Sequence, residues 1–260
     1  MNTTPSIHKV AETFVVEVRG IDLATQRDPE TIAWIEKTLA ENGVLVFHNQ
    51  KLSAEDIGDI GKKFGHIEAH IFDQYRHEAV PEVSYVTNRT RENEIDMYGV
   101  SRASMWHVDE PYKTYLAKLT MLHALEVPKV KGGTWFADSQ GAYDALDPKM
   151  KARVDGLISS FSVKTGHKSQ HPTAYVHPVT KRRGIFVSPQ HQIGFVGMEN
   201  DDGIALMNEL VDHATQPKFS YYHQWKVGDV LIWDDISTLH RNAADSDPNE
   251  RRIFLRTIVH

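Results

Sequence analysis

His107 and Asp109 stand two residues apart in the stretch "SMWHVDEPY" (104–112) and could bind one metal ion together. In an extended segment, residues i and i+2 point to the same side, so an imidazole and a carboxylate at this spacing can reach a common ion. With 15 histidines in the chain, a pair of this kind is expected by chance. A metal site therefore requires a third ligand from elsewhere in the sequence.

The third candidate ligand is His240, in the stretch "GDVLIWDDISTLHRN" (228–242). Two imidazoles and one carboxylate form the facial triad of non-haem Fe(II) oxygenases, which leaves adjacent coordination positions open for a bidentate co-substrate and O₂. The chain contains no cysteine, so thiolate ligands and iron–sulfur clusters are excluded. The sequence therefore predicts a metal centre, with a catalytic role, at His107, Asp109 and His240.

Two arginines near the end of the chain are candidates for binding anions. Arg252 and Arg256 are four residues apart in "RRIFLRTIV" (251–259), so in a strand they face the same side. At roughly 3.3 Å per residue they would lie about 13 Å apart, too far to share one carboxylate. Burying an arginine without an anion is costly, which favours two separate bound anions. The alternative, two rim residues in surface salt bridges, stays open.

Four segments have the periodicity and end signals of helices. Asp28 can cap the first of them, with Pro29 at its first position and Gly43 at its end. Ser53 and Asp56 form a capping-box pattern at the start of the second. The four predicted helices are 28–43, 53–65, 139–155 and 203–214.

Short apolar segments separated by turn signals predict a chain that is mainly β, with helices packed outside a sandwich or jelly roll. The predicted strands are 44–47, 119–127, 133–137, 184–188, 219–225, 229–233 and 252–259. Two polar stretches, 86–104 and 164–183, are predicted to be mobile loops, and the first leads directly to the His-x-Asp pair. Mobile segments beside a site often act as lids.

The composition is that of an ordinary globular protein, and we expect one domain over residues 1–260. The formal net charge of −6 argues against a nucleic-acid or membrane-surface binder. No apolar run approaches the length of a membrane span, and the N-terminus lacks a signal-peptide core, so a cytoplasmic protein is expected.

Taken together, a series of motifs resembles the taurine dioxygenase and 2,4-dichlorophenoxyacetate dioxygenase family of Fe(II)/2-oxoglutarate-dependent oxygenases. The resemblance covers nearly the whole chain and implies a double-stranded β-helix (jelly roll) core. Its motifs are "VRGIDLA" (18–24), "NGVLVFHNQKLS" (42–53), "KKFGHIE" (62–68), "WHVDEPY" (106–112), "GGTWFADSQGAYDAL" (132–146), "IFVSPQH" (185–191) and "VGDVLIWDDISTLHRNAADSDPNERRIFLR" (227–256).

The resemblance also implies a role for each matching residue. Fe(II), 2-oxoglutarate and O₂ are the expected cofactor and co-substrates. The implied roles are iron binding by His107, Asp109 and His240, 2-oxoglutarate binding by Thr134 and Arg252, and substrate binding by His70 and Arg256.

The expected reaction is hydroxylation of a C–H bond in a small, anionic organic substrate, with release of succinate and CO₂. A sulfonate, carboxylate, phosphonate or amino acid would fit Arg256, while the stretches 71–77 and 93–104 depart from the family pattern and leave the substrate open. Asp109 occupies the position that related halogenases leave free for halide, which favours hydroxylation; desaturation or cleavage stays open. Family members often form dimers or tetramers, so a homo-oligomer is expected.

Two alternatives from other classes remain. The same three side chains could hold Zn(II) and a water in a hydrolase, although Arg252 would then have no evident role. The chain could also be a non-catalytic barrel that senses a small molecule.

Overall fold

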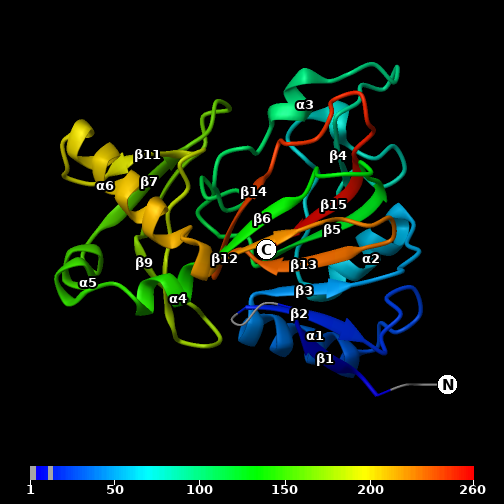
Figure 1. Ribbon diagram of the computed structural model, residues 1–260, viewed down its shortest axis with the longest axis horizontal. Helices are drawn as coiled ribbons and strands as arrows, with labels where there is room; N and C mark the ends of the chain where they lie inside the picture. Colours follow the sequence, from blue (N-terminus) through cyan, green and yellow to red (C-terminus); the bar gives the residue numbers. More distant parts are fainter. Residues whose placement is uncertain (1–3, 11–13) are drawn as a thin grey trace.

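The computed structural model describes residues 4–10 and 14–260, and its centre is a seven-stranded sheet (Figure 1). Most neighbouring strands of this sheet are far apart in the sequence, and the sheet joins the two ends of the chain. In spatial order its strands are β1 (Ser6–Lys9), β2 (Val15–Arg19), β3 (Val44–Phe47), β13 (Val230–Asp234), β5 (Leu119–Glu126), β15 (Ile253–Val259) and β4 (Ser84–Thr87).

Both faces of this sheet are covered, which explains the unbroken apolar run of β3. Leu45 and Phe47 pack on the side of helices α1 (Pro29–Asn42) and α2 (Ala54–Phe64), whereas Val44 and Val46 face the second sheet. Since side chains alternate between the two faces of a strand, a strand with two buried faces has no polar positions.

Helices α1 (Pro29–Asn42) and α2 (Ala54–Phe64) begin and end as their sequences predict. Asp28 accepts a hydrogen bond from the Thr31 N–H, and Gly43 follows the helix at φ 87°. Ser53 and Asp56 make both hydrogen bonds of the capping box. The end signals are local, so the sequence is sufficient to place these two helices.

A smaller sheet faces the large one and carries two of the residues expected in the site. Its strands are β12 (Ser220–His223), β6 (Thr134–Asp138) and β14 (Thr238–Asn242), in that order. Phe136 and Trp225 fill the space between the two sheets together with Trp233 and Phe254 from the large sheet. The two facing sheets form the expected jelly roll.

The segment between β6 and β12 folds into a separate lobe beside the sandwich (Figure 1). Phe161, Phe186 and Leu210 are among the residues at the centre of its own apolar cluster. Its elements are α4 (Ser139–Asp144), α5 (Pro148–Val154), β7 (Ile158–Ser162), β8 (Lys168–Pro172), β9 (Ala174–Val176), β10 (Arg183–Ile185), β11 (Gln192–Phe195), α6 (Asn200–Ala214) and the 3₁₀ turn η2 (Pro217–Phe219).

The predicted loop at 164–183 is wrong, because it contains strands β8 and β9. In β8 the buried positions are Ser169 and His171. The Ser169 hydroxyl donates to the Pro111 carbonyl, and the His171 ring hydrogen-bonds the carbonyl of Lys113 at 2.9 Å. Polar side chains satisfied inside the protein hide the usual apolar alternation of a strand.

Two other segments differ in detail from the sequence prediction. The stretch 86–104 contains the end of β4 and the short helix α3 (Met97–Ser101). The helix expected at 139–155 is two helices, because Asp147 and Pro148 start a new one. A 3₁₀ turn, η1 (Asp73–Tyr75), lies in the segment at 71–77. Among the described residues, none of the helices has the length and apolar character needed to cross a membrane.

Candidate active site

His107 and His240 are joined through their main chains. The N–H of His107 donates to the carbonyl of His240 at 3.0 Å, and the N–H of His240 donates back at 2.9 Å. The next residue, Val108, points the other way, into the apolar cluster of the second lobe. The arrangement expected for the His-x-Asp pair is therefore present, with the His107 imidazole and the Asp109 carboxylate on the side opposite Val108.

The turn between β13 and β14 sets the position of His240. The Asp234 carboxylate accepts hydrogen bonds from the N–H groups of Ile236 and Ser237, both at 2.9 Å. The Thr238 hydroxyl donates to the Asp234 carbonyl at 2.7 Å. This closed turn fixes the start of the strand on which His240 lies.

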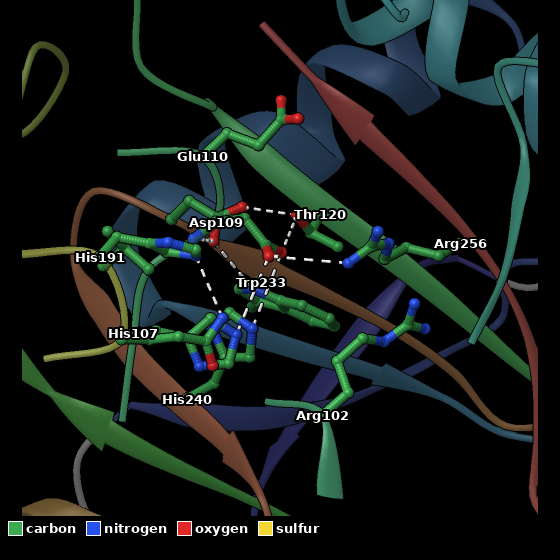
Figure 2. A network of polar contacts seen from close by, with 12 residues as sticks. Arg102, His107, Asp109, Glu110, Thr120, His191, Trp233, His240 and Arg256 are labelled. Carbon is green, nitrogen blue, oxygen red and sulfur yellow. Dashed lines mark hydrogen bonds and ion pairs between the residues drawn. The ribbon is translucent and has the colours of Figure 1, made fainter. Parts of the chain in front are cut away.

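The three predicted metal ligands meet in the interior (Figure 2). One ligand atom from each of His107, Asp109 and His240 lies within 4.8 Å of the other two, and all three residues are buried. Nε2 of His107 is 4.0 Å from one oxygen of Asp109, and Nε2 of His240 is 3.7 Å from the other. One ion placed among these atoms can contact all three.

Both rings are oriented so that Nε2 is available to an ion. Nδ1 of His107 lies 2.8 Å from the Met105 carbonyl, so Nδ1 carries the proton and Nε2 has a free lone pair. The ring of His240 is positioned by aromatic packing. Its centroid lies 4.8 Å from that of Trp233 and 6.2 Å from that of Phe136. Its Nδ1 is buried without a partner among the described residues. Two neutral imidazoles and a carboxylate, all buried and close together, form a ligand set that suits a divalent metal such as Fe(II).

Asp109 is held by a network of hydrogen bonds that the sequence did not reveal. The Thr120 hydroxyl lies 2.8 Å from Asp109 and 2.7 Å from Asp235. The same Asp235 accepts from the N–H of Asp109 at 3.3 Å and from the Trp233 ring at 3.1 Å. A hydroxyl has one proton, so both contacts of Thr120 are hydrogen bonds only when one carboxyl group is protonated.

The surroundings decide which of the two carboxyl groups keeps the proton. Burial raises the pKa of Asp235 far above its usual range, and the negative charge of Asp109 raises it further. Burial acts the same way on Asp109, but the positive charge of Arg256 and the hydrogen bond from Thr120 act against it, and the pKa of Asp109 is lowered. Asp235 therefore donates to Thr120, Thr120 donates to Asp109, and Asp109 stays anionic.

Thr134 and Arg252 lie side by side on the wall of the same cavity. The Thr134 hydroxyl accepts from the Trp225 ring at 3.0 Å and from Arg252 at 3.4 Å, which fills its lone pairs and leaves its proton to donate. Arg252 also donates to the Gly132 carbonyl at 2.9 Å. Within the described part of the chain no carboxylate pairs with this buried guanidinium, and burial lowers its pKa to about 10.

The two residues expected at the substrate share one hollow, but of the two only Arg256 also lines the cavity of the metal ligands. Arg256 lines the cavity of the metal ligands and lies 3.7 Å from a carboxylate oxygen of Asp109. His70 lines an adjoining hollow, where Arg256, Glu110 and His260 also lie. Burial and the positive charge of Arg256 lower the pKa of His70 to about 3, so its ring is neutral. Arg256 is thus beside the metal site, whereas His70 lines only the adjoining hollow.

The cavity that joins these residues is small in this structure, about 50 Å³. Gly99 of helix α3 and the following Arg102 and Ala103 form part of its wall. Pockets for small-molecule ligands are typically about 300–1,000 Å³, so the cavity must widen when ligands enter. The polar stretch 86–104, expected from the sequence to be mobile, supplies that wall.

The comparisons with known proteins show the family to which the chain belongs. The model of the taurine catabolism dioxygenase TauD, TfdA family matches residues 6–258, so the chain belongs to this family. The expected jelly-roll fold, the expected enzyme class and the expected use of Fe(II), 2-oxoglutarate and O₂ are thereby confirmed. The membership also favours an oxygenase over the zinc hydrolase and the non-catalytic barrel.

Two relatives and one solved structure illustrate the similarity. The (S)-phenoxypropionate/alpha-ketoglutarate-dioxygenase of Sphingobium herbicidovorans is 31% identical over 93% of this chain and 90% of its own length. The alpha-ketoglutarate-dependent 2,4-dichlorophenoxyacetate dioxygenase of a Burkholderia species is 28% identical, over 88% of this chain and 85% of its own. The crystal structure of AAD-2 in complex with Mn(II) and N-oxalylglycine superimposes with a TM-score of 0.89 at 27% identity, covering 99% and 97% of the two chains.

Proposed function

We propose that the chain is a single catalytic domain that hydroxylates a C–H bond of a small, anionic organic substrate. Fe(II), when bound with 2-oxoglutarate and O₂, supplies the oxidation: one oxygen atom enters the substrate and the other enters succinate, with loss of CO₂. The observation that carries the proposal is the convergence of His107, Asp109 and His240 in a cavity that Thr134 and Arg252 also line.

In this proposal the protein contributes geometry and charge. His107 and His240 present neutral Nε2 atoms to the metal, and Asp109 presents a carboxylate that Thr120 holds in place. Three protein ligands leave open positions for the co-substrate and O₂.

Thr134 and Arg252 are proposed to bind 2-oxoglutarate. The Arg252 guanidinium, buried and without a carboxylate in the described chain, pairs with the distal carboxylate of the co-substrate. The free hydroxyl proton of Thr134 donates to the same group. A buried charge–charge hydrogen bond of this kind is strong and directional, so it fixes which end of the co-substrate points to the metal.

The anionic character of the substrate rests on Arg256. Its contact with Asp109 leaves the rest of the guanidinium facing the cavity, where a substrate anion would lie next to the metal. Two relatives have carboxylic acids in their names, phenoxypropionate and 2,4-dichlorophenoxyacetate, which supports an acidic substrate.

Two measurements test the proposal. Purified protein with Fe(II) and 2-oxoglutarate, without O₂, should develop the visible absorption band of that complex, and His107→Ala should abolish it. A panel of small sulfonates, carboxylates, phosphonates and amino acids should then identify a compound that raises succinate formation above the level without substrate. Absence of the band, or retention of zinc rather than iron after purification, would reject the oxygenase.

A further inference from the structure

Arg102 has a buried hydrogen-bond donor that no group in the described chain accepts. Its Nη1 is shielded from solvent and has no partner among residues 4–10 and 14–260. Its Nη2 makes one long contact, 3.4 Å to the Tyr85 carbonyl. A buried, charged donor without an acceptor is unfavourable, so the position calls for an anion that the protein itself does not provide.

The guanidinium of Arg102 is held in place rather than free to turn outward. It stacks 4.3 Å from the centre of the Tyr75 ring, whose hydroxyl is fixed by Asp96 at 2.8 Å. Asn242 holds the backbone before and after Arg102. Its side chain donates to the Val100 carbonyl at 3.2 Å, and its N–H donates to the Ala103 carbonyl at 2.7 Å. The Arg102 side chain has therefore already lost most of its conformational entropy before a ligand binds.

Arg102 and Arg256 line the same cavity as the metal ligands. Figure 2 shows both guanidinium groups on one side of Asp109. The two cations repel each other, and burial together with Arg256 lowers the pKa of Arg102 to about 10. Among the described residues that line the cavity, Asp109 is the sole carboxylate. Its charge is used by the metal in the proposed function, so no other carboxylate among the described residues that line the cavity is left to pair with the two arginines.

We infer that Arg102 is a second substrate-binding residue, and that Arg102 and Arg256 together bind the oxyanion head group of the organic substrate. This inference rests on the proposed function and extends it. The head group lies between the two guanidiniums, where it accepts a hydrogen bond from the free Nη1 of Arg102. Carboxylate, sulfonate and phosphonate groups share this chemistry, and their relative affinities distinguish them.

The location of Arg102 links substrate binding to the wall of the cavity. Arg102 directly follows helix α3, and Gly99 of that helix lines the cavity. An anion that bridges Arg102 and Arg256 therefore connects this wall to strand β15 of the large sheet. Binding of the substrate head group stabilises the closed wall, in addition to orienting the substrate.

The test compares Arg102→Gln with wild type and with Arg91→Gln. Arg91 belongs to the same polar stretch, is about half exposed and lies outside the cavity, so the control removes the same charge without touching the site. Arg102→Lys keeps the charge and guards against a variant that fails to fold. Acetate, methanesulfonate and methylphosphonate serve as probes of the head group.

Two readouts are used for each variant. The first is the shift of the visible band of the complex with Fe(II) and 2-oxoglutarate, without O₂, as each probe is titrated. The second is the rise in thermal midpoint of the metal-free protein with the same probes. Loss of one charged hydrogen bond should raise the half-saturating concentration of the best probe about 10- to 100-fold in Arg102→Gln. Arg91→Gln should change it by less than about 2-fold, since an exposed charge is screened.

Three results would overturn the inference. Equal probe affinities in wild type and Arg102→Gln would remove Arg102 from the head-group site, and so would a wild type that responds to no probe. An increase in the 2-oxoglutarate concentration needed to form the band, with probe affinity unchanged, would assign Arg102 to the co-substrate. If the band never forms in wild type, the proposed function fails, and the thermal readout still decides whether Arg102 binds an oxyanion.

Discussion

The main chains of His107 and His240 form a reciprocal pair of hydrogen bonds, so two candidate metal ligands from distant parts of the sequence are placed by backbone geometry. The side chains are therefore not needed to bring the two segments together. The centre should assemble before a metal binds.

Replacement of either imidazole is expected to remove metal binding but to leave the fold. In His240→Ala the backbone bonds to His107 remain, and the lost ring has a buried Nδ1 without a partner in the described chain, so little hydrogen bonding is lost. Fe(II) affinity should fall by more than the roughly 10- to 100-fold that loss of an outer partner causes. Fe(II) titration and circular dichroism check this, with His66→Ala as a control on an exposed imidazole. Unchanged Fe(II) affinity in His240→Ala would place the centre elsewhere.

Replacement of Asp235 by asparagine should preserve stability and metal affinity, whereas replacement by alanine should lower both. The variant Asp235→Asn keeps an acceptor for the Trp233 ring and the Asp109 N–H, and the new amide donates to Thr120 as the protonated acid does. Asp235→Ala leaves these donors unpaired, which should cost about 1–3 kcal/mol of unfolding free energy and about 10- to 100-fold in metal affinity. Denaturant unfolding and Fe(II) titration measure both. An asparagine variant as weak as the alanine variant would show that Asp235 is ionised.

Arg252→Gln should weaken 2-oxoglutarate selectively. The variant loses the charge but keeps a donor for Gly132, so we expect the half-saturating concentration of 2-oxoglutarate to rise about 10- to 100-fold, with Fe(II) affinity nearly unchanged. Titration of the visible band without O₂ measures it. Thr134→Val, which has a similar shape and no hydroxyl, should act in the same direction and also leave the Trp225 ring unpaired. Normal 2-oxoglutarate dependence in both variants would refute these roles.

The metal-free protein should lose stability as the pH falls below about 6.5. Burial lowers the pKa of His70 to about 3 and that of His191 to about 4, and the positive charge of Arg256 adds to the shift at His70. Between these values and about 6.5 the unfolded chain binds more protons than the folded one, so stability is present at neutral pH and decreases in acid.

The expected result is a thermal midpoint a few degrees lower at about pH 5 than at about pH 7. In His70→Asn the amide oxygen can accept the Phe72 N–H in place of Nδ1, so the pH dependence should become shallower without a large loss at neutral pH. The same slope in His70→Asn and wild type would mean that His70 is not buried as a neutral ring.

Local signals were sufficient for part of the fold, and long-range contacts decided the rest. The ends of α1 and α2 follow from caps within a few residues, and these predictions are confirmed. Strand β8 was missed because Ser169 and His171 are buried through hydrogen bonds to Pro111 and Lys113, which no local pattern reveals.

The same distinction applies to the site. The pair at His107 and Asp109 was visible from its spacing, and the structure brings His240 to it. Arg102 was missed because its role depends on Tyr75 and Arg256, which are distant in sequence. The sequence does contain an indication for Asp235. Two acidic residues directly follow the apolar strand "VLIW", and a buried carboxylate requires hydrogen-bond partners.

The second lobe is inserted between β6 and β12, two strands that pair directly with each other. A contact that closes so long a stretch of chain forms slowly, because the entropy of loop closure must be overcome first. β6 in turn pairs with β14, which carries His240. During refolding, the helical signal of α1 and α2 should thus recover early, and the capacity to bind Fe(II) should return last.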